Sequence, residues 1–493
     1  MIYNFNLGIG WASSGVEYAQ IYRAKMFRNI GIDAKFVFTD MFPQENIEHM
    51  TKNIGFEDSE VIWLYTFFTD FKTAPVTYTL TDLEKTFSNT EYTKSREGKI
   101  CRYVFNGSNN FYTAYMVNEH DDFVHRVEMV SNGCLIRKDY FTYGRVYSEY
   151  YAPLDNAAHL YHRRFFNENG SVAYEEIIDD DRVMYKFKDK ILCSKEEFVG
   201  YMVSKLNLTS DDVVLIDRST DIGQSIIMNC KPARVGTVVH ADHFSEKDTN
   251  DDYILWNNFY EYEFNMHKHI DFYICSTQAQ SDLMVQQFEK YYGVTPCVYT
   301  IPVGSLPELK YPKESRKPYS LITASRLASE KHVDWICKAV IQASSEVPEV
   351  SLDIYGVGGE REKLETIIRD NNASDYIHLM GQHDLSEVYQ NYEAYIAGST
   401  SEGFGLTLME AVGGGLPIIG FDVRYGNPTF IRNGENGYLI SLPEEDKERI
   451  EALRKGIVDL FKHDLEKCHS VSYEVAKDFL TCNVQEKWRE AVC

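Results

Sequence analysis

Residues 399–419, STSEGFGLTLMEAVGGGLPII, are the segment most indicative of how this chain folds. It places one carboxylate, Glu402, in a glycine-containing loop and a second, Glu410, further along. The preceding letters AYIAGS are typical of a buried strand, and LTLMEAVGGG is typical of a helix that ends in glycines. The stretch therefore predicts a strand–turn–helix unit. Its helix begins near Leu406 and Thr407, where free backbone N–H groups can bind a phosphate.

The residues around this helix start favour a ligand site. Gly403 and Gly405 carry no side chain, so a bulky ligand can approach the backbone. Glu402 and Glu410 can each accept hydrogen bonds from ligand hydroxyls. For either glutamate alone, an exposed surface charge is the common alternative. The whole array predicts a sugar, a diphosphate and a ribose bound in a row.

Two cations follow an earlier strand. The letters TASRLASEKHVD place Arg326 at a strand end and Lys331 just before a helix. Helix N-termini favour acidic side chains, so two cations here indicate a bound anion such as a diphosphate, with solvated surface charges as the alternative. The turns in YGVGGEREKL (355–364) and MGQHD (380–384) end two further strands. Ligands bind outside the carboxyl ends of parallel strands, so these turns predict one binding edge.

The chain begins with another strand–turn–helix unit, IYNFNLGIG followed by SSGVEYAQIYRAKMFRNIG. Its turn, GIGWASSG, departs from the GxGxxG nucleotide-binding pattern because Ser13 takes the third glycine position. Gly8, Gly10 and Gly15 still allow close backbone approach, and a helix that begins near Gly15 offers N–H groups to an anion. A tight turn without a ligand is the alternative.

Residues 71–200 differ in texture from the rest. Short aromatic, alternating runs such as CRYVFNG, DFVHRVEMV and RVYSEYYA are separated by turn residues. This pattern predicts an antiparallel β meander inserted into an α/β chain. Its tyrosines either form a binding face or simply suit strands. The run DDD at 179–181 mimics the metal-binding DxD motif of other transferases, but its place between two strand runs predicts a hairpin turn.

Strand–helix alternation resumes after residue 210 and, beyond a polar break at 312–320, starts a second series. That series includes helices expected over LSEVYQNYE (385–393) and over the last segment, SYEVAKDFLTCNVQEKWREAV (472–492). Two such series joined by a short linker predict an α/β fold of two Rossmann-like, doubly wound domains that face each other across a cleft. We expect an N-terminal lobe over 1–70 and 201–311, the β insertion over 71–200, a C-terminal lobe over 312–472, and a helix over 473–493 that crosses back.

Composition narrows the class of protein. The 493 residues allow two or three domains, and no apolar run approaches the roughly 18–20 residues of a membrane span. A net charge of −24 disfavours non-specific binding to nucleic acid or to an anionic membrane. The N-terminal letters MIYNFNLGIGW lack a signal-type segment, and the ten cysteines show neither a CxxC pair nor zinc-ligand spacing. We therefore expect a cytoplasmic protein with free thiols.

The motifs together resemble a known family. Glu402-x7-Glu410, followed by GGGLPIIGFD and IRNGENGYLI and preceded by SRLASEK and YGVGG, resembles the retaining GT-B glycosyltransferases of the glycosyltransferase-4 type. LGIGWASSGVEYAQ, the β-rich insertion and VVHADHF extend the likeness to the catalytic (GtfA) subunits of accessory-secretion glycosyltransferases. Those enzymes start the O-glycosylation of serine-rich repeat adhesins, typically from UDP-N-acetylglucosamine. They pair with a related non-catalytic (GtfB) subunit.

The resemblance implies a role for individual residues. It implies that Arg326 and Lys331 hold the diphosphate, that Thr407 and the amide end at Leu406 bind a phosphate oxygen, and that Glu410 holds the ribose. It implies catalytic roles for Arg326, Lys331, Glu402 and His240, the histidine of VVHADHF. The implied sugar-binding residues are His240, Glu402, Gly403, Phe404 and Gly405. The remaining implied UDP contacts are Gln382 and His383 at the uracil, and Gly15, Val16, Glu17 and Tyr18 from the opposite lobe.

The resemblance also implies a mechanism without a metal or cofactor, in which departing UDP is stabilised and the anomeric configuration is retained. The expected partners are the GtfB-type subunit, a serine-rich acceptor polypeptide and the UDP-sugar, with no nucleic acid and at most peripheral membrane contact. The alternatives are transfer of glucose, transfer to a lipid or cell-wall acceptor, and a non-catalytic partner subunit.

Overall fold

The computed structural model describes residues 1–9, 15–88 and 90–493. Gly10 and Ser13, which the sequence singles out in the first turn, lie outside the described residues. The chain divides into two compact units. One comprises Met1–Val238 and Asn258–Asp271, and the other comprises Val239–Asn257 and Phe272–Cys493.

The first unit contains a parallel sheet built from the N-terminal strand–helix units. Its strands run in the order β15 (Arg234–Val239), β14 (Val213–Ile216), β1 (Ile2–Asn6), β2 (Ala34–Phe38) and β3 (Val61–Trp63). Its helices are α1 (Gly15–Ile30), α2 (Ile47–Ile54), α4 (Lys195–Lys205), α5 (Gly223–Ile227) and α6 (Glu261–Asn265).

A buried ion pair attaches α1 to the sheet. The Arg23 guanidinium donates to both carboxylate oxygens of Asp217, at 2.9 and 2.7 Å, and to the side chain of Asn4 at 2.8 Å. Gln20 donates to the same aspartate at 2.8 Å. Buried charges require such pairing, so the orientation of α1 on β1 and β14 is strongly specified.

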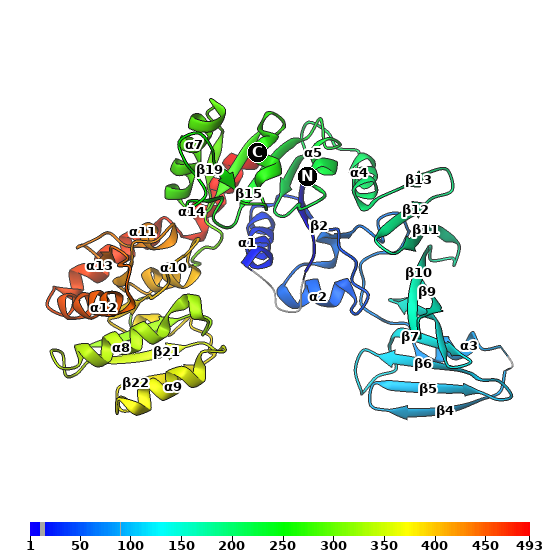
Figure 1. The fold of residues 1–493 in the computed structure, drawn as a ribbon, viewed down its shortest axis with the longest axis horizontal. Coiled ribbons are helices and arrows are strands. Elements are labelled where there is room, and N and C mark those ends of the chain that lie inside the picture. The colour runs from blue at the N-terminus through cyan, green and yellow to red at the C-terminus, as the bar shows by residue number, and fades with distance from the viewer. Residues whose placement is uncertain (10–14, 89) are drawn as a thin grey trace. The chain divides into compact units, whose positions relative to one another are not determined.

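The predicted β insertion is confirmed as one antiparallel sheet in which each strand pairs with the next (Figure 1). Its strands are β4 (Tyr92–Glu97), β5 (Ile100–Phe105), β6 (Asn110–Met116), β7 (Val124–Ser131), β8 (Cys134–Phe141), β9 (Arg145–Leu154), β10 (Ala157–Phe166), β11 (Val172–Asp179), β12 (Arg182–Lys186) and β13 (Ile191–Leu192). A short helix, α3 (Leu80–Lys85), packs Leu80 and Leu83 against one face. Asp179 pairs with Arg182, so DDD is the expected hairpin turn.

The second unit contains a parallel sheet whose strand order confirms the doubly wound pattern. The order is β22 (Ile377–Gly381), β21 (Ser351–Tyr355), β20 (Ser320–Ala324), β23 (Ala394–Ile396), β24 (Ile418–Phe421) and β25 (Gly437–Ile440). The strand order reverses between β20 and β23, which is where open α/β sheets bind ligands.

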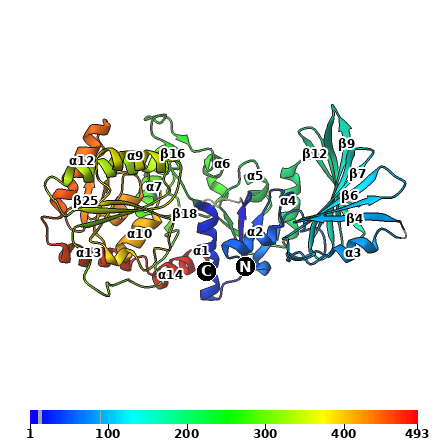
Figure 2. The same cartoon turned by 90° about the horizontal axis from the view of Figure 1, so that it is seen from below.

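Helices cover both faces of this sheet (Figure 2). One core cluster joins the sheet to α8 (Val333–Ala343), α9 (Arg361–Asp370) and α12 (Asp446–Leu460). The opposite cluster joins it to α10 (Leu406–Gly413), α11 (Gly426–Phe430) and α13 (Leu465–Lys477). The same unit holds the parallel strands β18 (Phe272–Cys275) and β19 (Val298–Thr300), helix α7 (Gln278–Tyr292), helix α14 (Thr481–Val492) and the small ladder β16 (Phe244–Ser245) with β17 (Leu255–Trp256).

Two sequence predictions of helices are wrong. The segment 385–393 forms only a 3-10 turn, Tyr389–Asn391, because the Arg316 guanidinium takes the carbonyls of Gln390 and Tyr392 at 2.9 and 2.8 Å. The expected single helix over 472–492 is split between α13 and α14. Its central backbone pairs with Leu306 instead: Leu306 N donates to the Phe479 carbonyl at 2.8 Å, and Thr481 N donates to the Leu306 carbonyl at 2.9 Å.

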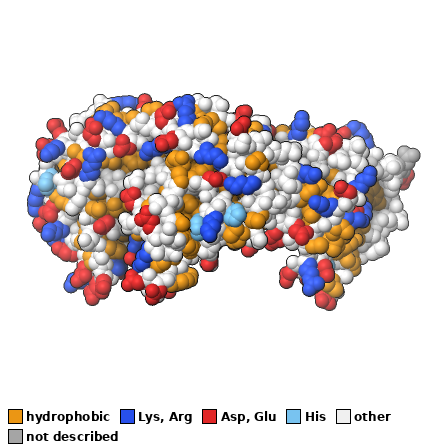
Figure 3. Space-filling view, turned by 90° about the horizontal axis from the view of Figure 1, so that it is seen from above, with side chains coloured by type: hydrophobic (Ala, Val, Ile, Leu, Met, Phe, Trp, Pro, Cys, Tyr) orange, Lys and Arg blue, Asp and Glu red, His pale blue; other side chains and the backbone are white. Residues whose placement is uncertain are grey.

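The excess of acidic residues does not produce a surface of one charge sign. On the face shown in Figure 3, basic and acidic side chains are interspersed. Within the described residues, every helix is too short or too polar to cross a membrane.

Candidate functional site

The opening motif forms the start of α10 at the carboxyl edge of the second sheet. Gly405 is the residue before the helix and has φ 90°, a left-handed conformation that suits glycine. A Cβ there would lie 2.7 Å from the Leu408 side chain. No side chain caps the helix, and in the described part of the chain the amides of Leu406 and Thr407 have no acceptor. The helix therefore presents free N–H groups and its positive end to the loop.

Glu402 and Lys331 meet beside this helix start. The Lys331 ammonium lies 2.5 Å from a Glu402 carboxylate oxygen, and each side chain is 20% exposed. Lys331 ends the 3-10 turn Ser329–Lys331 that follows β20. The Glu402 backbone is fixed in turn: its carbonyl accepts from the amides of Tyr425 and Gly426 at 2.5 and 2.7 Å. The structure thus brings together a cation and an acceptor that are distant in the sequence.

The other predicted cation is placed differently. Arg326 is 78% exposed, and its guanidinium pairs with Glu330 at 3.1 Å. The glycine turn of YGVGG lies against its strand exit, because a Cβ on Gly356 would lie 1.9 Å from the Ser325 carbonyl and one on Gly358 would lie 2.3 Å from the Leu327 carbonyl. Arg326 therefore lies at the same sheet edge as the glycine turn.

Two buried tyrosines, which the sequence did not single out, hold the motif's remaining polar side chains. Tyr389 donates to a Glu410 carboxylate oxygen at 3.0 Å, and Tyr395 donates to the Thr407 hydroxyl at 3.0 Å. Burial raises the pKa of Glu410, while the Tyr389 hydrogen bond opposes that rise. Tyr389 lies in the segment mispredicted as a helix, and Tyr395 reads only as a strand residue. No local sequence pattern predicts either contact.

The predicted sugar-binding residues differ in what they offer a ligand. Phe404 is 6% exposed and its ring packs against Phe430 and Phe479, so the ring is not free to contact a ligand. Gly403 is open: the nearest atom to a Cβ built there is the His240 carbonyl oxygen, at 3.6 Å. The structure thus brings the segment that carries His240 beside this loop.

The segment after His240 is anchored by a buried histidine. His243 is fully buried, with Nε2 at 2.7 Å from the Gln287 side-chain oxygen and Nδ1 at 3.3 Å from the Tyr425 hydroxyl. Gln280 donates to the Ala241 carbonyl at 2.8 Å. Burial lowers the pKa of His243 to about 4. Because these partners suit a neutral ring with its proton on Nε2, the ring links residues 240–243 to the loop that braces Glu402.

The two predicted uracil contacts follow β22 and are exposed. The His383 Nε2 atom lies 2.9 Å from the Met380 carbonyl, and its ring meets the Tyr355 ring edge-on at 5.8 Å. Gln382 lies next to it in the same turn. These side chains lie at the end of a strand next to β21, as the sequence predicts.

The remaining predicted UDP contacts belong to the first compact unit. Gly15, Val16, Glu17 and Tyr18 form the first turn of α1. Val16 and Glu17 are buried, whereas Tyr18 is 49% exposed. The Glu17 carboxylate lies 4.0 Å from Arg218. Their roles remain expectations.

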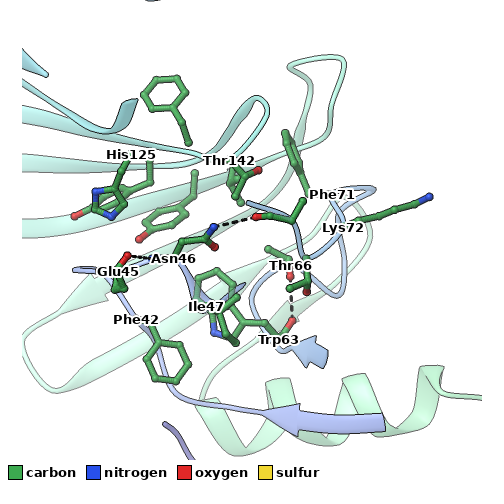
Figure 4. Close-up of a pocket in the computed structure, with 16 residues that line it drawn as sticks. Phe42, Glu45, Asn46, Ile47, Trp63, Thr66, Phe71, Lys72, His125 and Thr142 are labelled. Atoms are coloured by element: carbon green, nitrogen blue, oxygen red, sulfur yellow. Dashed lines mark hydrogen bonds between the residues drawn. The ribbon is translucent and has the colours of Figure 1, made fainter. Parts of the chain in front are cut away.

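A different cavity in the first unit contains none of the predicted site residues (Figure 4). It measures about 40 Å³ and lies where α2 and β3 meet the insertion. Asn46 donates to the Ala74 carbonyl at 2.9 Å on one wall, and burial lowers the pKa of His125 to about 4 on another. A space this small holds water rather than a substrate. No group of three or more potential metal-ligating side chains occurs in the described residues.

Comparison with known proteins agrees with this arrangement. Residues 93–189 match the family model described as GtfA extended beta-sheet domain, and residues 308–478 match the model described as Glycosyl transferases group 1. The chain is 52% identical over 492 residues to the UDP-N-acetylglucosamine–peptide N-acetylglucosaminyltransferase GtfA subunit of Streptococcus agalactiae, covering 99% of this chain and 97% of that protein.

Solved structures give the same result. A chain of the crystal structure of a GtfA/B complex aligns with TM-score 0.96 and 52% identity, over 100% of this chain and 99% of that one. The pneumococcal O-GlcNAc transferase GtfA, crystallised in complex with UDP and GlcNAc, aligns with TM-score 0.86 and 50% identity, over 100% of this chain and 98% of that one.

Proposed function

The chain belongs to the family of GtfA subunits of UDP-N-acetylglucosamine–peptide N-acetylglucosaminyltransferases, and from this premise we propose the acceptor, the site roles and the mechanism. It transfers N-acetylglucosamine from UDP-N-acetylglucosamine to Ser and Thr hydroxyls of a serine-rich repeat adhesin, as the first step of its O-glycosylation. The observation that carries this proposal is the Lys331–Glu402 pair of 2.5 Å beside the uncapped start of α10, with Glu410 one turn further.

The site supports a linear placement of the donor. The free amides of α10 and Thr407 bind the diphosphate together with Lys331 and Arg326. Glu410 accepts from the ribose, and Gln382 and His383 meet the uracil. Glu402, the backbone of Gly403 to Gly405, and His240 surround the sugar. For Gly15, Val16, Glu17 and Tyr18, at the start of α1, the proposed role is contact with UDP.

The reaction is driven by stabilisation of departing UDP. Negative charge grows on the β-phosphate as the bond to the sugar C1 breaks, and Lys331, Arg326 and the helix end oppose that charge. The acceptor hydroxyl attacks from the face that UDP leaves, so the anomeric configuration is retained, and a donor phosphate oxygen takes its proton. Glu402 is not assigned as a nucleophile, because attack by the acceptor from the face that UDP leaves requires no covalent intermediate on the protein. The reaction uses no metal.

The antiparallel insertion, expected over residues 71–200, serves the acceptor polypeptide and a GtfB-type partner. Apolar side chains remain exposed on its strands, among them Val104 at 45% and Ile191 at 57%. We place contacts with the polypeptide and the partner at these exposed apolar positions. The protein acts in the cytoplasm, at most peripherally at the membrane through its complex.

One assay tests the activity. The chain is incubated, with and without a GtfB-type partner, with UDP-N-acetylglucosamine and a Ser/Thr-rich peptide, and the peptide is weighed by mass spectrometry. We expect a mass increase of one or more N-acetylhexosamine units. A parallel reaction contains UDP-glucose in place of UDP-N-acetylglucosamine, and a mass increase only in that reaction identifies glucose as the donor sugar. No mass increase in any reaction, by a chain that still binds UDP, supports a non-catalytic subunit.

A second assay tests the insertion. Val104→Asp and Ile191→Asp place charges at its exposed apolar positions and are expected to lower peptide transfer, while hydrolysis of the donor by water is unchanged. Lys188→Asp, at an exposed polar position of the same insertion, is the control. If all three variants transfer to the peptide as fast as the wild type does, the insertion is not the acceptor or partner surface.

A further inference from the structure

The second compact unit holds a cavity that contains none of the donor-site residues. It measures about 360 Å³, within the range of small-molecule sites. Its wall is formed by the end of β18, the first turn of α7, Thr300 of β19, the α11 segment with Arg432, the end of α13, and Lys487 of α14.

One hydroxyl in this wall, that of Ser276, is open to the cavity and has no partner among the described residues. Ser276 is 6% exposed, and within the described residues its side chain makes no hydrogen bond. The three neighbouring threonines are all engaged: Thr277 accepts from the Gln280 amide at 3.2 Å, Thr300 contacts Ser281 at 2.7 Å, and Thr429 donates to the Tyr425 carbonyl at 2.8 Å. A hydroxyl on the cavity wall without a protein partner is free to donate to a bound molecule. A ligand in the cavity gives Ser276 the partner that the protein does not supply.

The first turn of α7 adds donors on the same wall. The Thr277 side chain caps the amide of Gln280, but the amides of Gln278 and Ala279 have no acceptor in the described chain. Gln278 and Ala279 both line the cavity. Amides at a helix start, together with the helix dipole, favour an anion.

The charged side chains of the wall favour a phosphate with a particular feature. Arg432 and Lys487 form no ion pair with any described residue, although acidic residues outnumber basic ones by 74 to 50 in this chain. Asp478 also lines the cavity. An ionised carboxylate can only accept hydrogen bonds, so it tolerates an anion that donates a hydroxyl and repels one that does not. Phosphate and sugar phosphates have such a donor at neutral pH, whereas sulfate has none.

We propose that this cavity binds the phosphate group of a small molecule that brings its own hydroxyl donor. Arg432 and Lys487 oppose the phosphate charge, Ser276 and the α7 amides donate to its oxygens, and Asp478 accepts the ligand hydroxyl. The donor comes either from the P–OH of inorganic phosphate or from the sugar of a sugar phosphate. This site goes beyond the proposed transferase activity and does not depend on it.

The test is calorimetric titration of the full chain at pH 7 with inorganic phosphate, glucose 1-phosphate and sulfate. Each titration is run with and without saturating UDP, so that binding to the diphosphate site is recognised by its loss in UDP. We expect saturable 1:1 binding of at least one phosphate ligand in UDP, at least tenfold tighter than sulfate. Tighter binding of glucose 1-phosphate than of inorganic phosphate identifies a sugar phosphate as the source, and the reverse identifies inorganic phosphate.

Variants assign the binding to these residues. Arg432→Gln combined with Lys487→Gln is expected to weaken phosphate binding at least tenfold, and Ser276→Ala about threefold or more. Asp478→Asn is expected to bring phosphate and sulfate within threefold of each other, a ratio that partial unfolding cannot change because it lowers both equally. Lys188→Gln, at an exposed lysine of the insertion, is the control and is expected to bind as the wild type does.

Three results overturn the proposal. They are the absence of saturable phosphate binding in UDP, equal wild-type affinity for phosphate and sulfate, and unchanged binding in the folded Arg432→Gln/Lys487→Gln variant.

Discussion

Replacing Tyr389 by phenylalanine removes one oxygen atom, which lies 3.0 Å from a Glu410 carboxylate oxygen. Tyr389 is 3% exposed, so water does not readily take the place of its hydroxyl. Burial already raises the pKa of Glu410, and the lost hydrogen bond removes an effect that lowers it. The carboxylate is then both less well oriented and more easily protonated. Glu410 is the proposed acceptor of hydrogen bonds from the ribose, so the variant should lose only the part of donor recognition that depends on the ribose hydroxyls.

The size of the effect follows from the bond that is lost. A hydrogen bond to a charged group contributes about 1.5–3 kcal/mol, and about 1.4 kcal/mol corresponds to a factor of ten. We therefore expect kcat/KM for UDP-N-acetylglucosamine to fall roughly 10- to 100-fold in Tyr389→Phe. The acidic limb of the pH–rate profile should also move to higher pH, because a raised Glu410 pKa leaves the carboxylate protonated over a wider range.

The assay compares the natural donor with analogues that lack the 2′- or the 3′-hydroxyl of the ribose. Wild type should prefer the natural donor, and Tyr389→Phe should lose most of that preference while its rate with the deoxy donor changes less than about threefold. Glu410→Gln should behave in the same way, and the double variant should add little, because both act on one interaction. Equal losses of rate with all donors would contradict a role for Tyr389 at the ribose, since they would indicate a general packing defect.

The remaining predictions concern the anion site, the fold and its pH dependence. Lys331→Ala should lower kcat for peptide transfer roughly 10²–10³-fold with little change in the thermal midpoint; turnover within threefold of wild type contradicts the donor assignment. Gly437→Ala should destabilise the protein by at least ~2 kcal/mol in urea unfolding, because the residue has φ 138° and a Cβ would lie 1.9 Å from the Ile418 carbonyl oxygen. Gly434→Ala is the control and should destabilise the protein less, because Gly434 has φ 79° but open space around a Cβ; an equal loss of stability would contradict the steric explanation. The pKa of His243 is lowered to about 4, so between about pH 4 and 6.5 the folded state binds fewer protons than the unfolded state and stability falls on acidification. His243 alone should lower the free energy of unfolding by ~2 kcal/mol between pH 7 and 5. His243→Gln should remove this loss, and an unchanged dependence of stability on pH in that variant would contradict the prediction.

Local patterns in the sequence predict much of the fold. Alternating apolar residues and turn signals predict the antiparallel insertion and the DDD hairpin, because cross-strand pairing follows the order of the chain. The α10 unit is equally local, since a buried strand, a glycine turn and a helical repeat are contiguous. The two wrong helices fail for the opposite reason. Arg316 and Leu306 take backbone groups of segments that lie far along the chain, and no local pattern contains that competition.

Short motifs are enough to identify the residue types of the donor site, because acceptor carboxylates, glycines and a helix start are contiguous chemical features of the chain. Which of these groups contact one another depends on the folded chain. It paired Lys331 with Glu402, attached Glu410 to Tyr389 and Thr407 to Tyr395, and buried the Phe404 ring. Hydrogen bonds and ion pairs act over a few ångströms, and the fold alone brings residues separated by dozens of positions within that distance.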